Sequence, residues 1–434
     1  MKKTLSILAA AAVCAAALTS CNGGGKSSGG SSAAKEDSNK NLVVWSFTDE
    51  LEGLINDYYK PTHPDMTVQY SLTPTDQFPS KLDPVLASGN GAPDVFALES
   101  AFVKKYIEEG PDLLLELDDI YAEVKNKMAD YPMKIATYNG HVYGMAWQVT
   151  PGALFYRRSY AKKYLGTDDP VKVQEFVKDL DTFLKTAALL KEKSGGKCDI
   201  VSATADMFMP YKGARKDPWV VNDKLVIDPA MDKYMEMAKV LHDNNYDGRV
   251  DQWSEGWYAG MKDTLKDEKG NPVEVFCYLL PTWGLHYVLK TNAPETAGDW
   301  AMCAGPAGYG WGGTWIAAYQ NTKNPKAAKE MIKYLATDDT YLEAYAKKSG
   351  DTVGNLNVQN KVKDDFSEAY LGGQNHYAQF CEMAKSVDGS LVQGSDQQIE
   401  ALFTEAVTAY AYGEKTKDQA LADFKAQVSS TLGY

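Results

Sequence analysis

The sequence predicts an α/β fold in which an open, mostly parallel sheet is flanked by helices. Short apolar, β-like runs alternate with amphipathic helical segments from residue 42 to a helix that begins at about Ala101. Alternation of this kind is typical of parallel sheets with helices on both faces. The length of 434 residues and the hydrophobic content of 44 % allow two or three domains, each with its own core.

The elements of this first region follow one another in a regular order. The expected strands are 42–47, 67–72 and 93–98, and the expected helices are 49–59, 78–86 and a segment from about Ala101. In open parallel sheets, ligands bind at the carboxyl ends of the strands. That rule points to Trp45, Ser46 and Phe47 at the first strand and to Glu99 at the third.

The stretch 139–165 reads as strand, break, strand and helix. Asn139-Gly140 supplies the positive φ of a tight hairpin turn, and Pro151-Gly152 interrupts the apolar run that carries Trp147 and Gln148. We interpret the stretch as a crossing between two lobes that leaves Trp147 and Gln148 in the crevice. The alternative is an ordinary hairpin-to-helix connection with Trp147 in a core.

The second half continues the α/β pattern. We expect helices over 173–193 and 232–242, strands over 273–280, 300–304 and 314–319, and helices that begin at Asn324, Ser395 and Thr416 as N-cap residues. Gly308, Gly310 and Gly313 match a dinucleotide-binding fingerprint, but a β-like run follows them where a helix is required. We therefore expect no nucleotide and no other cofactor.

The N-terminus has the features of an export signal. Lys2-Lys3 precedes an apolar run over 5–18, which is too short to span a bilayer. Leu18-Thr19-Ser20-Cys21 resembles the bacterial lipobox, in which the cysteine is lipidated. We predict a signal peptide over 1–20, a lipid on Cys21 and a flexible Gly/Ser-rich tether over 21–40. The alternative is a plain secretory signal.

Composition excludes several functions. The net charge of −13 argues against nucleic acid as a partner. The five histidines show no zinc-binding spacing, no nucleophile elbow or phosphate loop is present, and we expect neither a metal site nor catalysis. A glycosidase needs only two well-placed carboxyl groups, so that alternative stays open. Cys198, Cys277, Cys303 and Cys381 define no disulfide connectivity, and packing is the expected role of Cys277 and Cys303.

The nine tryptophans suggest a binding role. Most of them lie at strand ends or in loops flanked by Gly or Pro, and flat rings suit the apolar face of a pyranose. Nearby carboxylates and amides could bond sugar hydroxyls. The residues are Trp45, Trp147, Trp219, Trp257, Trp283, Trp311, Trp315, Glu99, Gln148 and Asp351. For any single tryptophan the alternative is core packing; Trp253 is the weakest candidate, and Trp300 is expected to be buried in its strand.

Several segments together resemble the sugar-type extracellular solute-binding lipoproteins of ABC importers, a maltose-binding-protein-like family. The segments are VVWSF (43–47), KLDPVLASGNGAPDVFAL (81–98), HVYGMAWQVTPGALFYRRSYAKKYLG (141–166), GWGGTWIAA (310–318) and NPKAAKEMIKYL (324–335). By position, Trp45, Glu99, Trp147, Gln148, Trp283, Trp311 and Trp315 match ligand contacts of the family, and Asp76 and Gln77 match a further polar contact. Relatives often have Asp in place of Gln148, so the resemblance leaves the sugar's identity open.

The resemblance implies a two-lobed, periplasmic-binding-protein-like fold. Lobe one would comprise 42–150 with 305–350, and lobe two would comprise 151–304 with 351–434. The implied function is capture of an oligosaccharide between the lobes and delivery to the membrane subunits of an ABC permease. We expect a monomer held outside the cytoplasm by its lipid. The competing functions are a surface glycan-degrading enzyme, a binding protein for a non-sugar solute and an adhesin.

Overall fold

The computed structural model describes residue 37 and residues 40–434, which belong to one compact unit. The predicted signal peptide (1–20), the predicted lipidation site Cys21 and nearly all of the predicted tether (21–40) lie outside the described residues and stay predictions. In the part of the chain that the structure describes, no helix combines the length and the apolarity that a membrane span requires.

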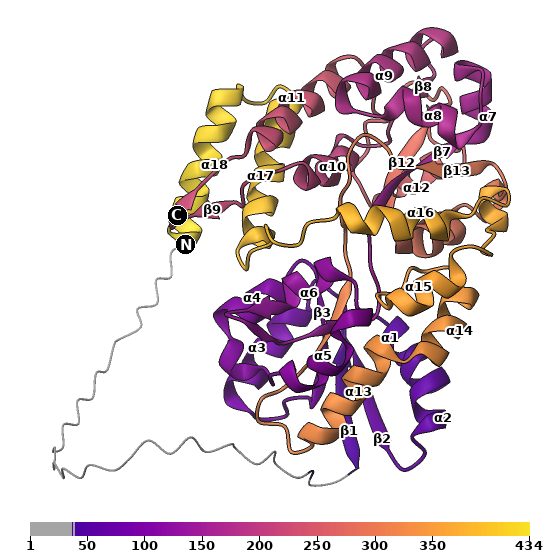
Figure 1. The fold of residues 1–434 in the computed structure, drawn as a ribbon. Helices are drawn as coiled ribbons and strands as arrows, with labels where there is room; N and C mark the ends of the chain where they lie inside the picture. Colours follow the sequence, from indigo (N-terminus) through magenta and orange to yellow (C-terminus); the bar gives the residue numbers. More distant parts are fainter. Residues whose placement is uncertain (1–36, 38–39) are drawn as a thin grey trace, which may run out of the picture. The chain divides into compact units, whose positions relative to one another are not determined.

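The first lobe is built on a five-stranded sheet with the strand order β2-β1-β3-β14-β6 (Figure 1). Its strands are β1 (Asn41–Ser46), β2 (Thr67–Leu72), β3 (Val95–Glu99), β6 (Met145–Ala146) and β14 (Thr314–Ala318). β1 pairs in parallel with β2 and β3, as the alternating pattern predicts. The chain returns from the second lobe to form β14, which pairs antiparallel with β3 and β6.

The second lobe contains a three-stranded sheet with the order β12-β7-β13. Its strands are β7 (Gly152–Arg157), β12 (Cys277–Pro281) and β13 (Trp300–Cys303). Both pairs are antiparallel, so the prediction of a mostly parallel sheet is wrong for this sheet. The reason is the direction of the chain: β7 carries it away from the first lobe, whereas β13 leads it back toward β14.

Short two-stranded sheets complete the β-structure. They pair β4 (Thr137–Tyr138) with β5 (His141–Val142), β8 (Cys198–Asp199) with β11 (Glu274–Val275), and β9 (Val220–Val221) with β10 (Lys224–Leu225). Asn139 and Gly140 form the two-residue turn between β4 and β5 with φ values of 50° and 86°. The hairpin that Asn139-Gly140 predicts is therefore confirmed.

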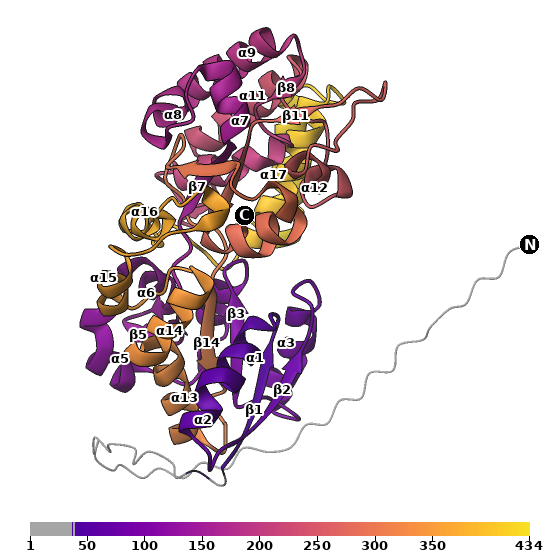
Figure 2. The same cartoon turned by 90° about the vertical axis from the view of Figure 1, so that its right-hand side faces the viewer.

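Helices surround both sheets (Figures 1 and 2). The first lobe has α1 (Glu50–Leu54), α2 (Lys60–Thr62), α3 (Phe78–Ser88), α4 (Val103–Glu109), α5 (Asp118–Val124), α6 (Asp130–Ala136), α13 (Pro325–Thr337), α14 (Asp339–Ser349) and α15 (Leu356–Val362). The second has α7 (Arg158–Tyr160), α8 (Pro170–Val177), α9 (Leu180–Ser194), α10 (Phe208–Gly213), α11 (Pro229–Asp243), α12 (Glu255–Met261), α16 (His376–Met383), α17 (Asp396–Ala411) and α18 (Lys417–Leu432).

The structure corrects three of the four expectations about helix ends and confirms one. The single helix expected over 173–193 is two helices, because Asp179 caps α9 by accepting a hydrogen bond from Thr182 N–H at 2.7 Å. Asn324 makes no capping bond to α13; Asp37 instead accepts from Lys326 N–H and Ala327 N–H. Ser395 forms no capping bond, whereas the capping box that begins at Thr416 is confirmed.

Separate hydrophobic cores hold the two lobes. One core packs the helices of the first lobe on the five-stranded sheet, and two others pack the second lobe on its sheet. Val353, Val358 and Val362 belong to the first core, although they fall within 351–434, the range that the resemblance assigns to lobe two. Helix α16 contributes Tyr377 to the first core and Phe380 to a core of the second. The four described cysteines are free and buried, in agreement with packing roles for Cys277 and Cys303.

Candidate functional site

A cleft of about 1010 Å³ is lined by residues of both lobes. The first lobe contributes Phe47, Thr48, Asp49, Glu50, Leu72, Thr75, Asp76, Glu99, Gln148 and Thr314. The second lobe contributes Trp253, Trp283, Tyr287 and Gln397, and the loop that connects β13 to β14 contributes Trp311, Gly312 and Gly313. A ligand of this cleft would therefore touch both lobes.

The carboxyl ends of the parallel strands form one wall of the cleft. Phe47 directly follows β1, Leu72 ends β2 and Glu99 ends β3. Because these strands run in the same direction, their ends meet at one edge of the sheet. The general rule for open sheets thus locates this wall from the sequence alone.

Three indoles gather on the opposite side. The ring centroids of Trp253 and Trp283 are 6.3 Å apart with an interplanar angle of 17°. Trp311 meets both rings edge-on, at 5.7 Å from Trp253 and 5.6 Å from Trp283. Trp253 is 44 % exposed, and Tyr287, which also lines the cleft, is 49 % exposed. Exposed aromatic surface in a concave site indicates a ligand that covers it.

The connecting loop can hold these indoles only because it contains glycine. Gly312 has a φ of +74°, and a Cβ there would lie 2.6 Å from Trp283 Nε1. The same Nε1 donates a 3.0 Å hydrogen bond to the carbonyl oxygen of Trp311. Any larger residue at 312 would strain the backbone and displace the Trp283 ring.

Carboxylates dominate the polar lining, and all of them belong to the first lobe. They are Asp49, Glu50, Asp76 and Glu99, and no Lys, Arg or His is among the described residues that line the cleft. Burial raises the pKa of Glu99, although hydrogen bonds from Ala101 N–H and from Ser100 oppose the shift. The cleft therefore offers hydrogen-bond acceptors from one lobe and flat apolar rings from the other.

Glu50 of the cleft lining shares the hydroxyl group of Tyr345 with a second, buried acid, Asp351. Tyr345 Oη lies within hydrogen-bonding distance of Glu50 Oε1 and 3.1 Å from Asp351 Oδ2. One phenol proton can serve only one acceptor, so the second contact requires a proton on a carboxyl group. Burial and the charge of Asp351 raise the pKa of Glu50, and burial raises the pKa of Asp351. The pair therefore keeps a proton at pH values above the ordinary pKa of a carboxylic acid.

Comparison with known proteins gives the family. Residues 54–371, more than half of the chain, match the family described as bacterial extracellular solute-binding protein. The chain belongs to this family. The resemblance that the sequence segments indicate is thereby confirmed, and so is the expectation of a protein that acts outside the cytoplasm.

Individual relatives support the same assignment. The arabinooligosaccharide-binding protein of Halalkalibacterium halodurans is 24 % identical over 308 residues, which cover 68 % of this chain and 66 % of that protein. The chain thus spans slightly less than two thirds of that relative. A crystal structure of an extracellular solute-binding protein of family 1 aligns over 90 % of this chain and 99 % of its own, with a TM-score of 0.77 and 19 % identity.

A further solved structure has a bound ligand. The ABC transporter associated binding protein from B. animalis subsp. lactis Bl-04, in complex with β-1,6-galactobiose, aligns over 90 % of this chain and 97 % of its own, with a TM-score of 0.70 and 20 % identity. These likenesses confirm the predicted two-lobed α/β fold.

In this solute-binding protein, five of the predicted site residues line the cleft together. They are Asp76, Glu99, Gln148, Trp283 and Trp311. Asp351 is buried and does not line the cleft; Tyr345 Oη, 3.1 Å from Asp351 Oδ2, also contacts the cleft residue Glu50. Gln77 precedes α3, is exposed and does not line the cleft, and Trp45 packs partly buried against the first core.

Four predicted tryptophans lie in cores instead. Trp147, Trp219 and Trp257 are 0 % exposed and Trp315 is 1 % exposed. Their neighbours are protein groups: Trp257 Nε1 donates to Asp206 Oδ1 at 2.9 Å, and Trp315 Nε1 donates to Pro132 O at 2.8 Å. Packing, the alternative for any single tryptophan, therefore describes these four in this structure.

Sequence reasoning missed several lining residues. Trp253, the weakest tryptophan candidate in the sequence, contacts both other indoles of the cleft. Its sequence signal is the polar setting Asp251-Gln252-Trp253-Ser254, which favours a position near the surface. Leu72 is an apolar residue at the exposed end of a strand, which is a recognisable signal. For Tyr287 and Gln397 we find no sequence signal.

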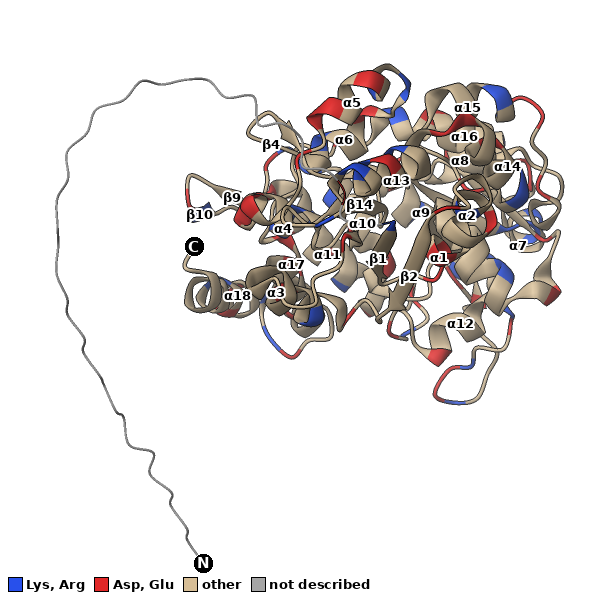
Figure 3. Cartoon of the chain, turned by 90° about the horizontal axis from the view of Figure 1, so that it is seen from below, with Lys and Arg blue, Asp and Glu red and all other residues tan. Residues whose placement is uncertain are grey.

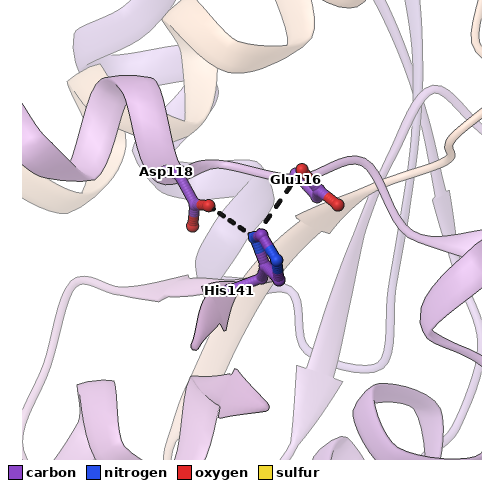
Figure 4. Close-up of side chains that lie close together, drawn as sticks. All are labelled: Glu116, Asp118 and His141. Carbon is purple, nitrogen blue, oxygen red and sulfur yellow. Dashed lines mark hydrogen bonds and ion pairs between the residues drawn. The ribbon is translucent and has the colours of Figure 1, made fainter. Parts of the chain in front are cut away.

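One exposed group has metal-ligand chemistry without being a cleft residue. Glu116, Asp118 and His141 offer ligand atoms within 4.8 Å of one another (Figure 4). Asp118 is the first residue of α5, whose Asp and Glu residues are red in Figure 3. His141 Nδ1 lies 2.7 Å from Asp118 Oδ2, and Asp118 Oδ1 accepts from Val142 N–H at 2.7 Å. The hydrogen bond to Asp118 raises the pKa of His141. We interpret the group as a link between the hairpin and α5.

Proposed function

We propose that this protein is the substrate-binding component of an ABC transporter and that it captures an oligosaccharide between its two lobes. The observation that carries the proposal is the division of the cleft: three indoles and Tyr287 face four acidic side chains of the first lobe. A sugar has complementary surfaces, since its C–H face is apolar and its hydroxyl groups can donate to carboxylates.

The indoles would supply most of the affinity. Covering apolar surface contributes about 25 cal/mol per Å², and the exposed parts of Trp253 and Tyr287 are available for this contact. The carboxylates of the cleft would select among sugars, because each bond to a hydroxyl replaces a bond to water and adds little net free energy.

Lobe closure follows from this division. A ligand that needs rings from one lobe and acceptors from the other gains both contacts only when the lobes approach each other. Such a ligand shifts an existing equilibrium between open and closed forms. The closed form would then deliver the sugar to the membrane subunits of the transporter.

The remaining parts of the proposal concern anchoring and chemistry. The lipobox-like sequence at Cys21 supports a lipid anchor on the outer side of the membrane, with the tether keeping the protein near its permease. We propose a binding protein that makes and breaks no bond. The glycan-degrading alternative predicts release of new reducing ends from the same sugars.

Calorimetric titration with neutral oligosaccharides tests the proposal. The panel contains arabino-oligosaccharides, β-1,6-galactobiose, xylo-oligosaccharides and malto-oligosaccharides, with short peptides and divalent cations as non-sugar ligands. We expect binding by at least one glycan and loss of that binding in Trp283→Ala and Trp311→Ala. Tyr412→Ala, which removes an exposed ring outside the cleft, is the matched control. Binding of a peptide or a cation and of no glycan would contradict the proposal, as would new reducing ends.

A further inference from the structure

A second cavity adjoins the cleft on the other side of Trp311. This side chamber has a volume of about 220 Å³, and Glu99, Trp311, Gly312 and Gln397 line both the chamber and the cleft. The volume is several times the ~30 Å³ that one water molecule occupies in the liquid. The shared walls make the chamber an extension of the same ligand path.

Two buried charged side chains of the second lobe face the chamber. Arg215 and Asp396 are only 7 % and 4 % exposed. Arg215 Nη2 is 3.8 Å from Asp396 Oδ2, which is longer than a hydrogen bond. Arg215 Nη1 and both carboxylate oxygens of Asp396 have no hydrogen-bond partner within the described residues. Buried polar atoms in native proteins are paired, so these three indicate polar groups that come from outside the chain.

The surroundings hold the two side chains in place. Arg215 Nε donates to the carbonyl oxygen of Lys212 at 3.3 Å, and the guanidinium lies over the Trp219 ring at 5.2 Å. Lys212 and Glu400, which also line the chamber, are paired with each other at 2.7 Å. The lining of the chamber therefore combines two basic side chains, Lys212 and Arg215, with four acidic ones: Glu99, Asp388, Asp396 and Glu400. The excess of acids disfavours an anion, whereas a neutral polar ligand finds both donors and acceptors.

An uncharged ligand with adjacent hydroxyl groups fits this arrangement. One hydroxyl can accept from Arg215 Nη1 while its neighbour donates to a carboxylate oxygen of Asp396, since a hydroxyl both donates and accepts. Aromatic and aliphatic side chains complete the walls, including Tyr131 and Ile135 of the first lobe. A sugar ring presents the same combination of vicinal hydroxyls and apolar C–H groups.

We propose that the side chamber is a terminal subsite that takes the end unit of an oligosaccharide whose preceding units lie against the cleft indoles. This inference rests on the proposed function and deepens it, because it assigns a minimum length to the ligand. Affinity should rise at the chain length at which the end unit first reaches Arg215 and Asp396.

A length series tests the subsite. Calorimetry compares α-1,5-arabino-oligosaccharides and β-1,6-galacto-oligosaccharides of two to six units on the mature chain. We expect the affinity to rise about tenfold at one step of a ladder, which is the effect of hydrogen bonds to charged groups. Ala101→Leu adds bulk at an exposed residue of the chamber wall, and Asp396→Asn removes one charge. Either change should lower the affinity for the longer probe to that of the shorter one.

A matched variant controls for the added bulk. Ala122→Leu makes the same change at an exposed alanine of α5 that lines neither cavity, and it should keep the length step. Equal affinities along the ladders would overturn the subsite and leave the proposed function standing, because the chamber would then hold only water. A step that survives both chamber variants would also overturn it. Failure of every glycan to bind would overturn the proposed function together with the subsite.

Discussion

The tryptophans of the cleft and those of the cores come from similar sequence settings but have opposite environments. Trp283 and Trp311 lie beside Gly and line the cleft, whereas Trp315, two residues beyond Gly313, is buried in the first core. The difference follows from secondary structure. Trp311 belongs to a loop, while Trp315 belongs to β14, between β3 and β6, where both sheet faces are covered. Whether an indole binds ligand or stabilises the fold thus depends on its position relative to a strand.

The largest expected difference between the two groups is in stability. Trp219→Ala should lower the free energy of unfolding by about 3–5 kcal/mol, because Trp219 is fully buried against Phe403 and Phe424. Trp253→Ala should lower it by only about 1 kcal/mol, since Trp253 is 44 % exposed. Denaturant unfolding measures both values. Equal losses would contradict the distinction between the groups.

A smaller effect is expected from the glycine that makes room for an indole. Gly312→Ala should cost about 1–3 kcal/mol of stability and shift the Trp fluorescence, because the new Cβ would meet Trp283. Gly140→Ala is a matched control: its φ is also positive, at +86°, but a Cβ there would meet no atom within 4 Å. Unfolding curves of the two variants measure the cost of backbone strain at a positive φ, and fluorescence spectra report whether the Trp283 ring is displaced. Identical results for both would show that the contact with Trp283 does not matter.

The acid pair formed by Glu50, which lines the cleft, and the buried Asp351 predicts a dependence of stability on pH. The folded-state pKa of Glu50 is raised above its ordinary value of 4.5, so the folded state holds a proton that the unfolded state has lost. Stability from this pair is complete below pH 4.5 and decreases as pH rises through the raised pKa, by about 1.4 kcal/mol per unit of pKa difference. Glu50→Gln should flatten this part of the profile. A wild-type stability that increases over the same interval, with no change in the variant, would contradict the protonated pair.

The smallest effect concerns the exposed pair on the hairpin. The pKa of His141 is raised by its hydrogen bond to Asp118, above the ordinary value of 6.5. Its contribution to stability is therefore present below pH 6.5 and is lost as pH rises through the raised pKa. An NMR titration of the imidazole gives the pKa directly, and Asp118→Asn should return it toward the ordinary value. An unchanged titration would show that the contact has no electrostatic effect.

Local patterns were sufficient for the scaffold of the first lobe. The alternation in the sequence predicts the strand Thr67–Leu72 with the bounds that the structure has, and the rule on strand ends points to Glu99, which lines the cleft. These elements are specified by short-range periodicity and by turns such as Asn139-Gly140. The parallel pairs follow from the helices that connect them.

The features that local sequence patterns do not predict depend on contacts between residues far apart in the chain. The antiparallel sheet of the second lobe depends on the return path of the chain, and Asp37 caps a helix almost three hundred residues away. Tyr287 reaches the cleft from η6 (Gly284–Lys290), and its neighbours in sequence do not distinguish it from a core tyrosine. Trp253 is exposed, whereas Trp257, four residues later, is buried in a core of the second lobe. This difference likewise depends on long-range packing.

Indole ¹H–¹⁵N NMR of the protein, titrated with the glycan that calorimetry selects, tests the central claim most directly. Single Trp→Phe variants assign the signals. We predict that the Nε1 signals of Trp253, Trp283 and Trp311 shift with the ligand, whereas those of Trp219 and Trp257 stay in place. Shifts confined to the core indoles, or a saturated complex in which the three cleft signals do not move, would contradict a sugar held against these rings.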